Sequence, residues 1–222
     1  MLIESPSEHA TELEVDPSFA AARVSLWPTD YSNGELVGGH YRVAPSTGLV
    51  TGAAAAGALL SLRWADANRG FALLRAIVQA VVTTPSYPSP PEFSVDLVRV
   101  KNFTVADTGG TGITLGDENR LSARMGNSQV ADLRVATTGA LTNGTGTAEA
   151  VAKATALLRM DNVQGSTARE VLFDAAAGVE HPFELQAGQG FRIRLKEAQG
   201  TSGVTKFHFV LVWAEVPKRF GG

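Results

Sequence analysis

The sequence predicts an all-β domain built as a β-sandwich and preceded by an extended N-terminal arm. In residues 191–196, apolar and cationic side chains alternate with a period of two, which is the period of a β-strand. A turn-forming stretch at residues 200–203 leads into a second strand at residues 204–216, and the two are expected to close the domain as a β-hairpin. The middle of the second strand is apolar on both faces, which is typical of a central strand covered from two directions.

Composition indicates the same fold class. The chain has 222 residues, of which 44% are hydrophobic and only 18% are charged, together with 23 glycines and 10 prolines. Low charge and many turn-forming residues suit strands joined by tight turns better than long solvated helices. A sandwich of this length is commonly a single unit, so one domain is expected.

Charge, cysteine content and the terminal sequence limit the classes of function. The net charge of −3 gives no electrostatic reason to expect a nucleic-acid partner. The absence of cysteine excludes disulfides and thiolate metal sites. The N-terminus lacks the features of a secretory signal, and the alanine-rich residues 52–60 are too few to span a bilayer. We therefore expect a soluble product of a cytoplasm with no membrane partner.

Residues 1–20 differ from the rest of the chain and are assigned to an arm, with the sandwich domain at residues 21–222. Acidic side chains dominate the arm, and its apolar points are Leu13, Val15 and Phe19. Two interpretations stay open. The arm is either a frayed, solvated terminus, or it becomes ordered by lying across a neighbouring subunit, where the alternation of Leu13 and Val15 would suit an added edge strand.

Strands are expected wherever alternating or β-branched runs lie between turn signals. In chain order they occupy residues 23–27, 40–44, 59–65, 71–84, 93–103, 130–135, 155–160 and 171–173, ahead of the closing pair. The prolines of residues 85–91 form a rigid connection within the domain, because the strand pattern resumes at Phe93. No internal repeat or break in composition indicates a second domain.

Two segments allow a helical alternative. Residues 71–84 contain an apolar stripe at helical spacing, but a period of two gives an entirely apolar face opposite a polar one, and the run ends in β-branched residues, which favours a strand. Residues 148–158 are rich in alanine and place Glu149 four residues before Lys153, so a short helix stays open there.

The sharpest candidate for chemistry is Asp107, which begins an Asp-Thr-Gly tripeptide after the strand-like residues 103–106. An aspartic protease holds such a carboxylate at a tight turn, paired with a second carboxylate that shares its proton. The second copy is missing here, so that chemistry would need a symmetric homodimer with one Asp107 from each chain. We favour a glycine-rich turn in which Asp107 bonds its own backbone.

The remaining candidates have structural explanations. The four histidines have no metal-ligand spacing, and the glycines of residues 109–116 do not form a phosphate-binding loop. The cationic stripe of Arg192, Arg194 and Lys196 is either a site for an anion or an acidic partner or a solvated outer sheet face, and we favour the solvated face. The tryptophans are expected in the core. No catalytic residue, cofactor site or metal site is predicted.

Four segments together resemble small β-rich proteins from the structural modules of tailed bacteriophages: residues 63–66, 81–84, 103–111 and 212–216. The similarity runs from about residue 20 to the C-terminus, and the acidic arm is the least matched part. It implies a jelly-roll-like β-sandwich that serves as a virion structural protein, foremost a capsid decoration (cement) protein, often trimeric. The implied partners are the phage major capsid protein or other virion proteins, and the implied location is the virion, assembled in the host cytoplasm.

The resemblance also allows a second class, a tail- or head-fibre-associated receptor- or glycan-binding module. A glycan site would need exposed aromatic side chains, so a cluster of Tyr31, Tyr41 and Tyr87 beside a groove would favour it. For the assembly role, the candidate subunit or capsid contacts are Leu13, Val15 and Phe19 in the arm and His208, Val210 and Val212 on the outward face of the last strand.

Overall fold

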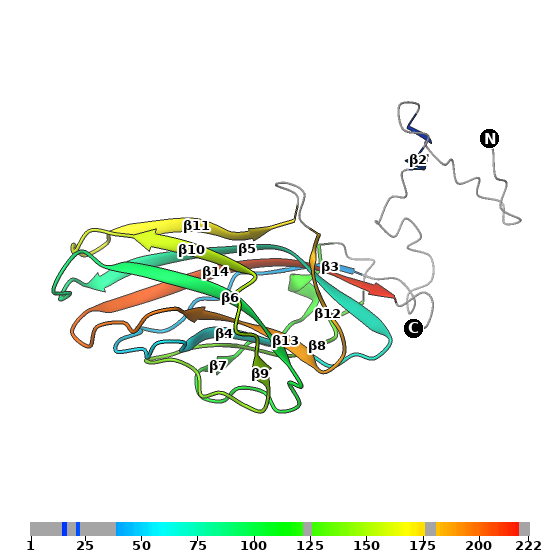
Figure 1. Cartoon of the computed structure of the whole chain (residues 1–222), viewed down its shortest axis with the longest axis horizontal. Helices are drawn as coiled ribbons and strands as arrows, with labels where there is room; N and C mark the ends of the chain where they lie inside the picture. The colour runs from blue at the N-terminus through cyan, green and yellow to red at the C-terminus, as the bar shows by residue number, and fades with distance from the viewer. Residues whose placement is uncertain (1–14, 17–20, 23–38, 122–125, 176–180, 218–222) are drawn as a thin grey trace, which may run out of the picture.

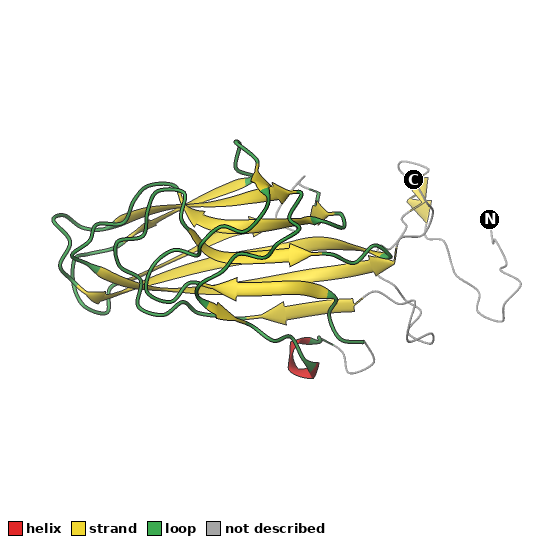
Figure 2. Cartoon of the chain, turned by 90° about the horizontal axis from the view of Figure 1, so that it is seen from below, coloured by secondary structure: helices red, strands yellow, loops and turns green. Residues whose placement is uncertain are grey.

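The protein is a β-sandwich of two antiparallel sheets, which Figure 1 shows face to face. The structure, a computed structural model, describes residues 15–16, 21–22, 39–121, 126–175 and 181–217. Within these ranges there is no α-helix, and the single 3-10 turn, η1 (Asp117–Asn119), lies outside the strands (Figure 2). Near the N-terminus, β1 (Val15–Asp16) pairs only with β2 (Ala21–Ala22).

The larger sheet comprises β4 (Ala58–Trp64), β6 (Glu92–Lys101), β7 (Thr111–Gly112), β8 (Val130–Val135), β9 (Thr147–Ala148), β10 (Ala154–Arg159) and β13 (Gln189–Leu195). Its strand order is β10-β6-β13-β4-β8-β7, and β9 pairs with the end of β6. The central strands of this sheet are therefore β13 and β4, and each of them has a neighbour on both sides.

The smaller sheet comprises β3 (Gly39–Val43), β5 (Arg69–Thr84), β11 (Thr167–Asp174), β12 (Phe183–Leu185) and β14 (Val204–Pro217). Its strand order is β11-β5-β14-β3, and β12 pairs with β5 beyond the end of β11. At one margin of the sandwich, β10 of the larger sheet lies beside β11 of the smaller one (Figure 1).

Most strands predicted from local pattern are present. β3, β4, β6, β8, β10 and β11 correspond to the predicted segments, and residues 71–84 form the strand β5. The helical alternative for residues 148–158 is wrong, because β9 ends and β10 begins there. The strand predicted at residues 23–27 lies outside the described residues.

The predicted closing hairpin is also wrong, because β13 and β14 lie in opposite sheets. β13 pairs with β4 on one side and β6 on the other, so neither edge is left for β14. β14 pairs instead with β5 and β3. The connection between them crosses the sandwich through the buried Gln199, whose amide donates to the carbonyl of Val50 (3.0 Å) and to the Tyr87 hydroxyl (2.8 Å).

The core lies between the sheets and contains a group of aromatic rings in mutual contact. Trp213 on β14 stacks against Tyr41 on β3 at 5.5 Å and against Phe71 on β5 at 6.0 Å, measured between ring centroids. Phe71 in turn contacts Phe191 of the opposite sheet at 6.1 Å. Trp64 and Trp213 are both fully buried, as expected for core tryptophans, whereas Trp27 lies outside the described residues.

The alternation along β14 predicts unequal costs for substitutions at adjacent positions. Leu211 faces the core and is fully buried, while Val212 faces outward and is half-buried. We expect Leu211→Ala to lower the free energy of unfolding by about 2–5 kcal/mol, and Val212→Ala to lower it by about 1 kcal/mol or less. Urea denaturation of both variants measures the difference, and equal losses would contradict the orientation of β14.

Candidate functional site

The three predicted contact residues on β14 share the outer face of the smaller sheet. His208, Val210 and Val212 are half-buried, whereas Phe207, Phe209 and the other residues that alternate with them are buried against the core. β14 is paired along both edges, so these outward side chains stand near the middle of the sheet. Whether they contact another subunit stays a prediction.

The strand register extends Val210 into an apolar row across the sheet. Val210 lies directly opposite Ile77 on β5, and Ile77 lies opposite Val171 on β11. Residues directly opposite in neighbouring antiparallel strands project from the same face. Ile77 is only 6% exposed, but Val171 is 49% exposed although it is apolar. Val171, Ile77 and Val210 are called the apolar row below.

Cationic and imidazole side chains occupy the positions on either side of the apolar row. On one side, His208 lies opposite Gln79, which lies opposite Arg169. On the other side, Val212 lies between Arg75 and Arg42. Arg75 is ion-paired with Asp174 (Nε–Oδ2 3.3 Å). The outer face of this sheet is therefore apolar along its middle and basic along both flanks.

His208 lies on this basic surface, but its imidazole carries no positive charge at neutral pH. Its partial burial lowers the pKa of His208, and the positive charge of Lys206 lowers it further. Both effects disfavour the imidazolium form. The permanent charges on this face therefore come from arginine and lysine.

A buried ion pair on the opposite sheet was not predicted from the sequence. Arg192 was expected on a solvated face, but it is 4% exposed, and Asp107 is fully buried. The Arg192 guanidinium donates through Nε to Asp107 Oδ2 (2.7 Å) and through Nη2 to Oδ1 (2.6 Å), and it lies over the Phe103 ring at 5.1 Å. Two parallel charge-assisted hydrogen bonds are the strongest geometry for such a pair.

The local backbone brings Asp107 over β13. β6 ends at Lys101, Asn102 takes a left-handed conformation (φ 52°), and the chain then folds back across the outer face of the larger sheet. Gly144 approaches so closely that a Cβ there would collide with the carbonyl oxygens of Val105 and Ala106, and its N–H donates to Asp107 Oδ1 (2.7 Å). The prediction that Asp107 bonds its own turn is therefore wrong, because its partners lie 37 and 85 residues along the chain.

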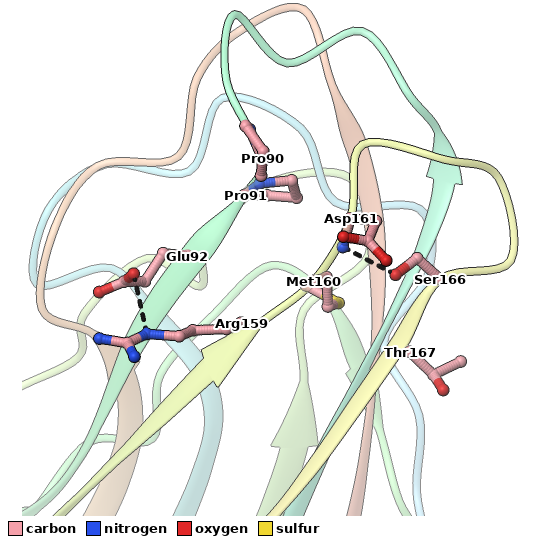
Figure 3. Close-up of a pocket in the computed structure, with 8 residues that line it drawn as sticks. All are labelled: Pro90, Pro91, Glu92, Arg159, Met160, Asp161, Ser166 and Thr167. Atoms are coloured by element: carbon pink, nitrogen blue, oxygen red, sulfur yellow. Dashed lines mark hydrogen bonds and ion pairs between the residues drawn. The ribbon is translucent and has the colours of Figure 1, made fainter.

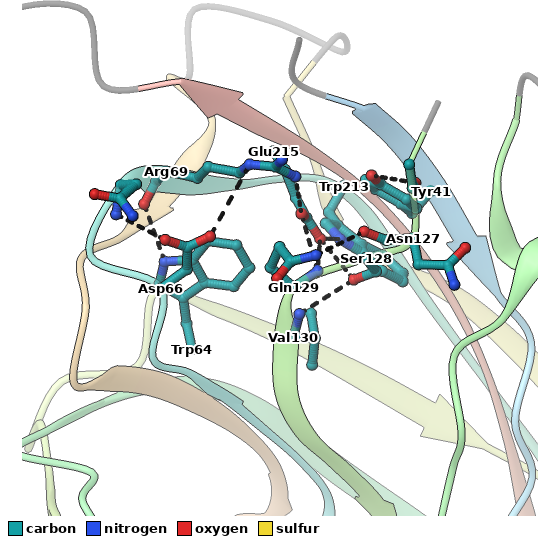
Figure 4. A network of polar contacts seen from close by, with 12 residues as sticks. Tyr41, Trp64, Asp66, Arg69, Asn127, Ser128, Gln129, Val130, Trp213 and Glu215 are labelled. Atoms are coloured by element: carbon teal, nitrogen blue, oxygen red, sulfur yellow. Dashed lines mark hydrogen bonds and ion pairs between the residues drawn. The ribbon is translucent and has the colours of Figure 1, made fainter. Parts of the chain in front are cut away.

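Glu215 is a second buried carboxylate, near the end of β14 (Figure 4). It accepts hydrogen bonds from Ser128 Oγ (2.6 Å), the Gln129 N–H (3.1 Å) and Trp213 Nε1 (3.2 Å), and Arg69 Nη1 lies 3.7 Å away. Burial raises the pKa of Glu215 despite these donors, which act in the opposite direction. The sequence did contain a signal for this burial, because strict alternation after the core residue Trp213 places Glu215 on the inner face of β14.

A pocket of about 330 Å³ lies where β6 begins, β10 ends and β11 begins (Figure 3). Its polar groups face one another. Arg159 Nε donates to Glu92 Oε2 (3.1 Å), and the Asp161 N–H donates to Ser166 Oγ (2.9 Å). The side chains of Arg159 and Glu92 are both exposed to solvent, and surface ion pairs of this kind contribute little to stability. These polar groups of the pocket are therefore already hydrogen-bonded to one another.

The tyrosines do not form the exposed cluster that a glycan site would need. Tyr41 is 1% exposed and Tyr87 is 8% exposed, and Tyr31 lies outside the described residues. Burial raises the pKa of Tyr41 to about 12, and the negative charge of Glu215 adds to this effect. Among the described residues, the exposed large hydrophobic side chains are all leucines and valines.

Leu13 and Phe19 lie outside the described residues, and Val15 is described through its backbone pairing with Ala22. In the part of the chain that the structure describes, no three His, Cys, Asp or Glu side chains are arranged to hold a metal ion. No helix of that part is long and apolar enough to cross a membrane. Comparison with protein-family models, curated proteins and solved structures gives no match.

The Arg192–Asp107 pair predicts a large and non-additive effect on stability. We expect Asp107→Ala to lower the free energy of unfolding by about 3–5 kcal/mol, because it leaves a buried guanidinium without a counter-charge. The double variant Asp107→Ala/Arg192→Met should lose less than the sum of the two single changes. Chemical denaturation of all four proteins measures the coupling, and strictly additive losses would rule out a direct pair.

Glu215 predicts a specific pH dependence. Because its pKa in the folded protein lies above 4.5, the folded state takes up a proton at a higher pH than the unfolded chain. Its contribution to stability should therefore rise as pH falls through the raised pKa towards 4.5 and stay constant below that. Thermal denaturation should show wild type gaining stability relative to Glu215→Gln over this range. A relative loss on acidification would contradict the raised pKa.

Proposed function

We propose that this chain is a structural virion protein of a tailed phage, which decorates or cements the capsid through protein–protein contacts as a homotrimer. The observation that carries the proposal is the outer face of the smaller sheet. A sheet face exposed to water is normally polar, yet the outward positions here include Val171, Val210 and Val212. Apolar surface rimmed by polar residues is typical of a contact with another protein.

We also propose that the sandwich is a jelly roll. The strand pairs β4–β13, β5–β11, β6–β10 and β7–β8 are nested, so that each pair encloses the next along the chain. A long hairpin folded over on itself produces this nesting, and jelly rolls are the architecture of many viral capsid domains. The additional strands β3 and β14 widen the smaller sheet, and β8 departs from the usual arrangement by pairing with β4.

A trimer would suit the position of this face. Cyclic symmetry lets one patch on each subunit meet a different patch on the next, and the ring closes without leaving an unused contact. The apolar row occupies the middle of the sheet, so a neighbour could cover it while the larger sheet stays available to the capsid.

The alternative function, a receptor- or glycan-binding module, has less support. Sugar rings stack on exposed aromatic side chains, and Tyr41, Tyr87, Trp64 and Trp213 are all buried. Exposed valines and leucines suit a protein partner better than a glycan.

The test of the proposed function is assembly onto phage heads. We expect the purified protein to have the mass of a trimer by light scattering and to bind heads of the encoding phage that were assembled without it. Val210→Asp should weaken binding at least tenfold, because it places an unpaired charge in an apolar contact. The matched control is Val151→Asp, at a position that is 74% exposed beside the other sheet. Equal binding by both variants, or a monomeric wild type, would count against the proposal.

A further inference from the structure

We propose that the acidic N-terminal segment of this chain, residues 1–20, docks on the outer face of the smaller sheet. Its apolar residues would cover the apolar row, and its net negative charge would be attracted by the flanking cations. The inference deepens the proposed assembly function, on which it rests, by naming the occupant of that face.

Charge separates the segment from the rest of the chain. Residues 1–20 contain five acidic side chains and no lysine or arginine. The remaining 202 residues contain 19 lysines and arginines against 17 acidic side chains, so they carry the opposite net charge. The negative net charge of the whole protein therefore resides in its first 20 residues.

The outer face of the smaller sheet carries a net positive charge. Four strands contribute one cation each to it: Arg42 from β3, Arg75 from β5, Arg169 from β11 and Lys206 from β14. One carboxylate, Asp174, offsets part of this charge through its pair with Arg75. Opposite net potentials on two surfaces favour their association and determine which partner is chosen.

The sequence of the segment also fits the spacing of the face. In residues 12–16, the acidic Glu12, Glu14 and Asp16 alternate with Leu13 and Val15. When such a stretch is extended, it covers roughly 17 Å, whereas an apolar row across three strands spans roughly 10 Å. Leu13 and Val15 project from one side of such a stretch and can therefore lie over the row. The carboxylates project from the other side, so the flanking cations attract the segment through its net charge and not through direct ion pairs.

The connection to the sandwich is long enough. Described structure resumes at Gly39, where β3 enters the same sheet and pairs with β14. The residues between β2 and β3, 23–38, can extend over roughly 55 Å, so the face of this molecule and that of a neighbouring copy are both within reach. The β1–β2 pairing involves backbone groups of residues 15, 16, 21 and 22 and is compatible with docking as a short two-stranded unit.

Disulfide trapping in the full-length protein tests the docking directly, because the chain has no cysteine of its own. We expect Val15→Cys/Val210→Cys to form a disulfide at least tenfold faster than Val15→Cys/Val151→Cys under the same mild oxidant, as followed on non-reducing gels. Val151 is more exposed than Val210, so accessibility alone would make the control disulfide form faster. Equal rates, or a faster control, would overturn the proposal.

Charge reversal provides the second measurement. Adding Glu12→Lys and Glu14→Lys to the Val15→Cys/Val210→Cys protein should slow trapping, and 0.5 M salt should slow it in the parent because salt screens surface charge. Rates unchanged by both treatments would overturn the electrostatic basis of docking.

The trapping needs no phage particle, so its failure is distinguishable from failure of the proposed function. If trapping fails while Val210→Asp still abolishes binding to heads, the face has a different occupant and the assembly function stands. If trapping succeeds while heads are not bound, the docking stands and the capsid role falls.

Discussion

The contact between Phe71, Trp213 and Phe191 joins the two sheets at the aromatic centre of their shared core. Phe71 stacks on Trp213 within its own sheet and meets Phe191 across the core. Aromatic pairs of this geometry contribute beyond the area that they bury. Trp213 also donates to Glu215, so the same ring anchors a buried carboxylate that joins the end of β14 to Ser128 and Gln129, which lead into β8 of the larger sheet. This packing, together with the pairing of β14 with β5 and β3, holds β14 with its alternate side chains on the outer face.

Local pattern was sufficient to predict most of the longer strands, but it missed the short β7, β9 and β12 and could not predict which strands pair. The period-two alternation of β5 depends only on residues next to one another, and it correctly favoured a strand over a helix. The pairing of β13 depends on which strand edges are free, and β4 and β6 had already taken both. Residue spacing contains no such information, which is why the predicted hairpin failed.

The candidate site, too, was predicted from local pattern only in part. Alternation correctly separated His208, Val210 and Val212 from the core-facing residues of β14, but it could not indicate that Ile77 and Val171 continue the row. The Arg192–Asp107 pair joins residues 85 positions apart, and a stripe of alternating cations looks the same whether it is solvated or covered. A loop folding back over a sheet face turns such a stripe from surface into interior, and only the tertiary structure reveals it.

The order of strands along the chain has a consequence for how the protein is made. β13 is inserted between β4 and β6, and β14 between β5 and β3, so both sheets receive a central strand from residues 189–217. Until that segment leaves the ribosome, each sheet is divided into halves with unpaired inner edges, which are prone to wrong pairing. Neither sheet can therefore be completed before residues 189–217 have been made. Folding of the chain should be slow and governed by contacts distant in sequence.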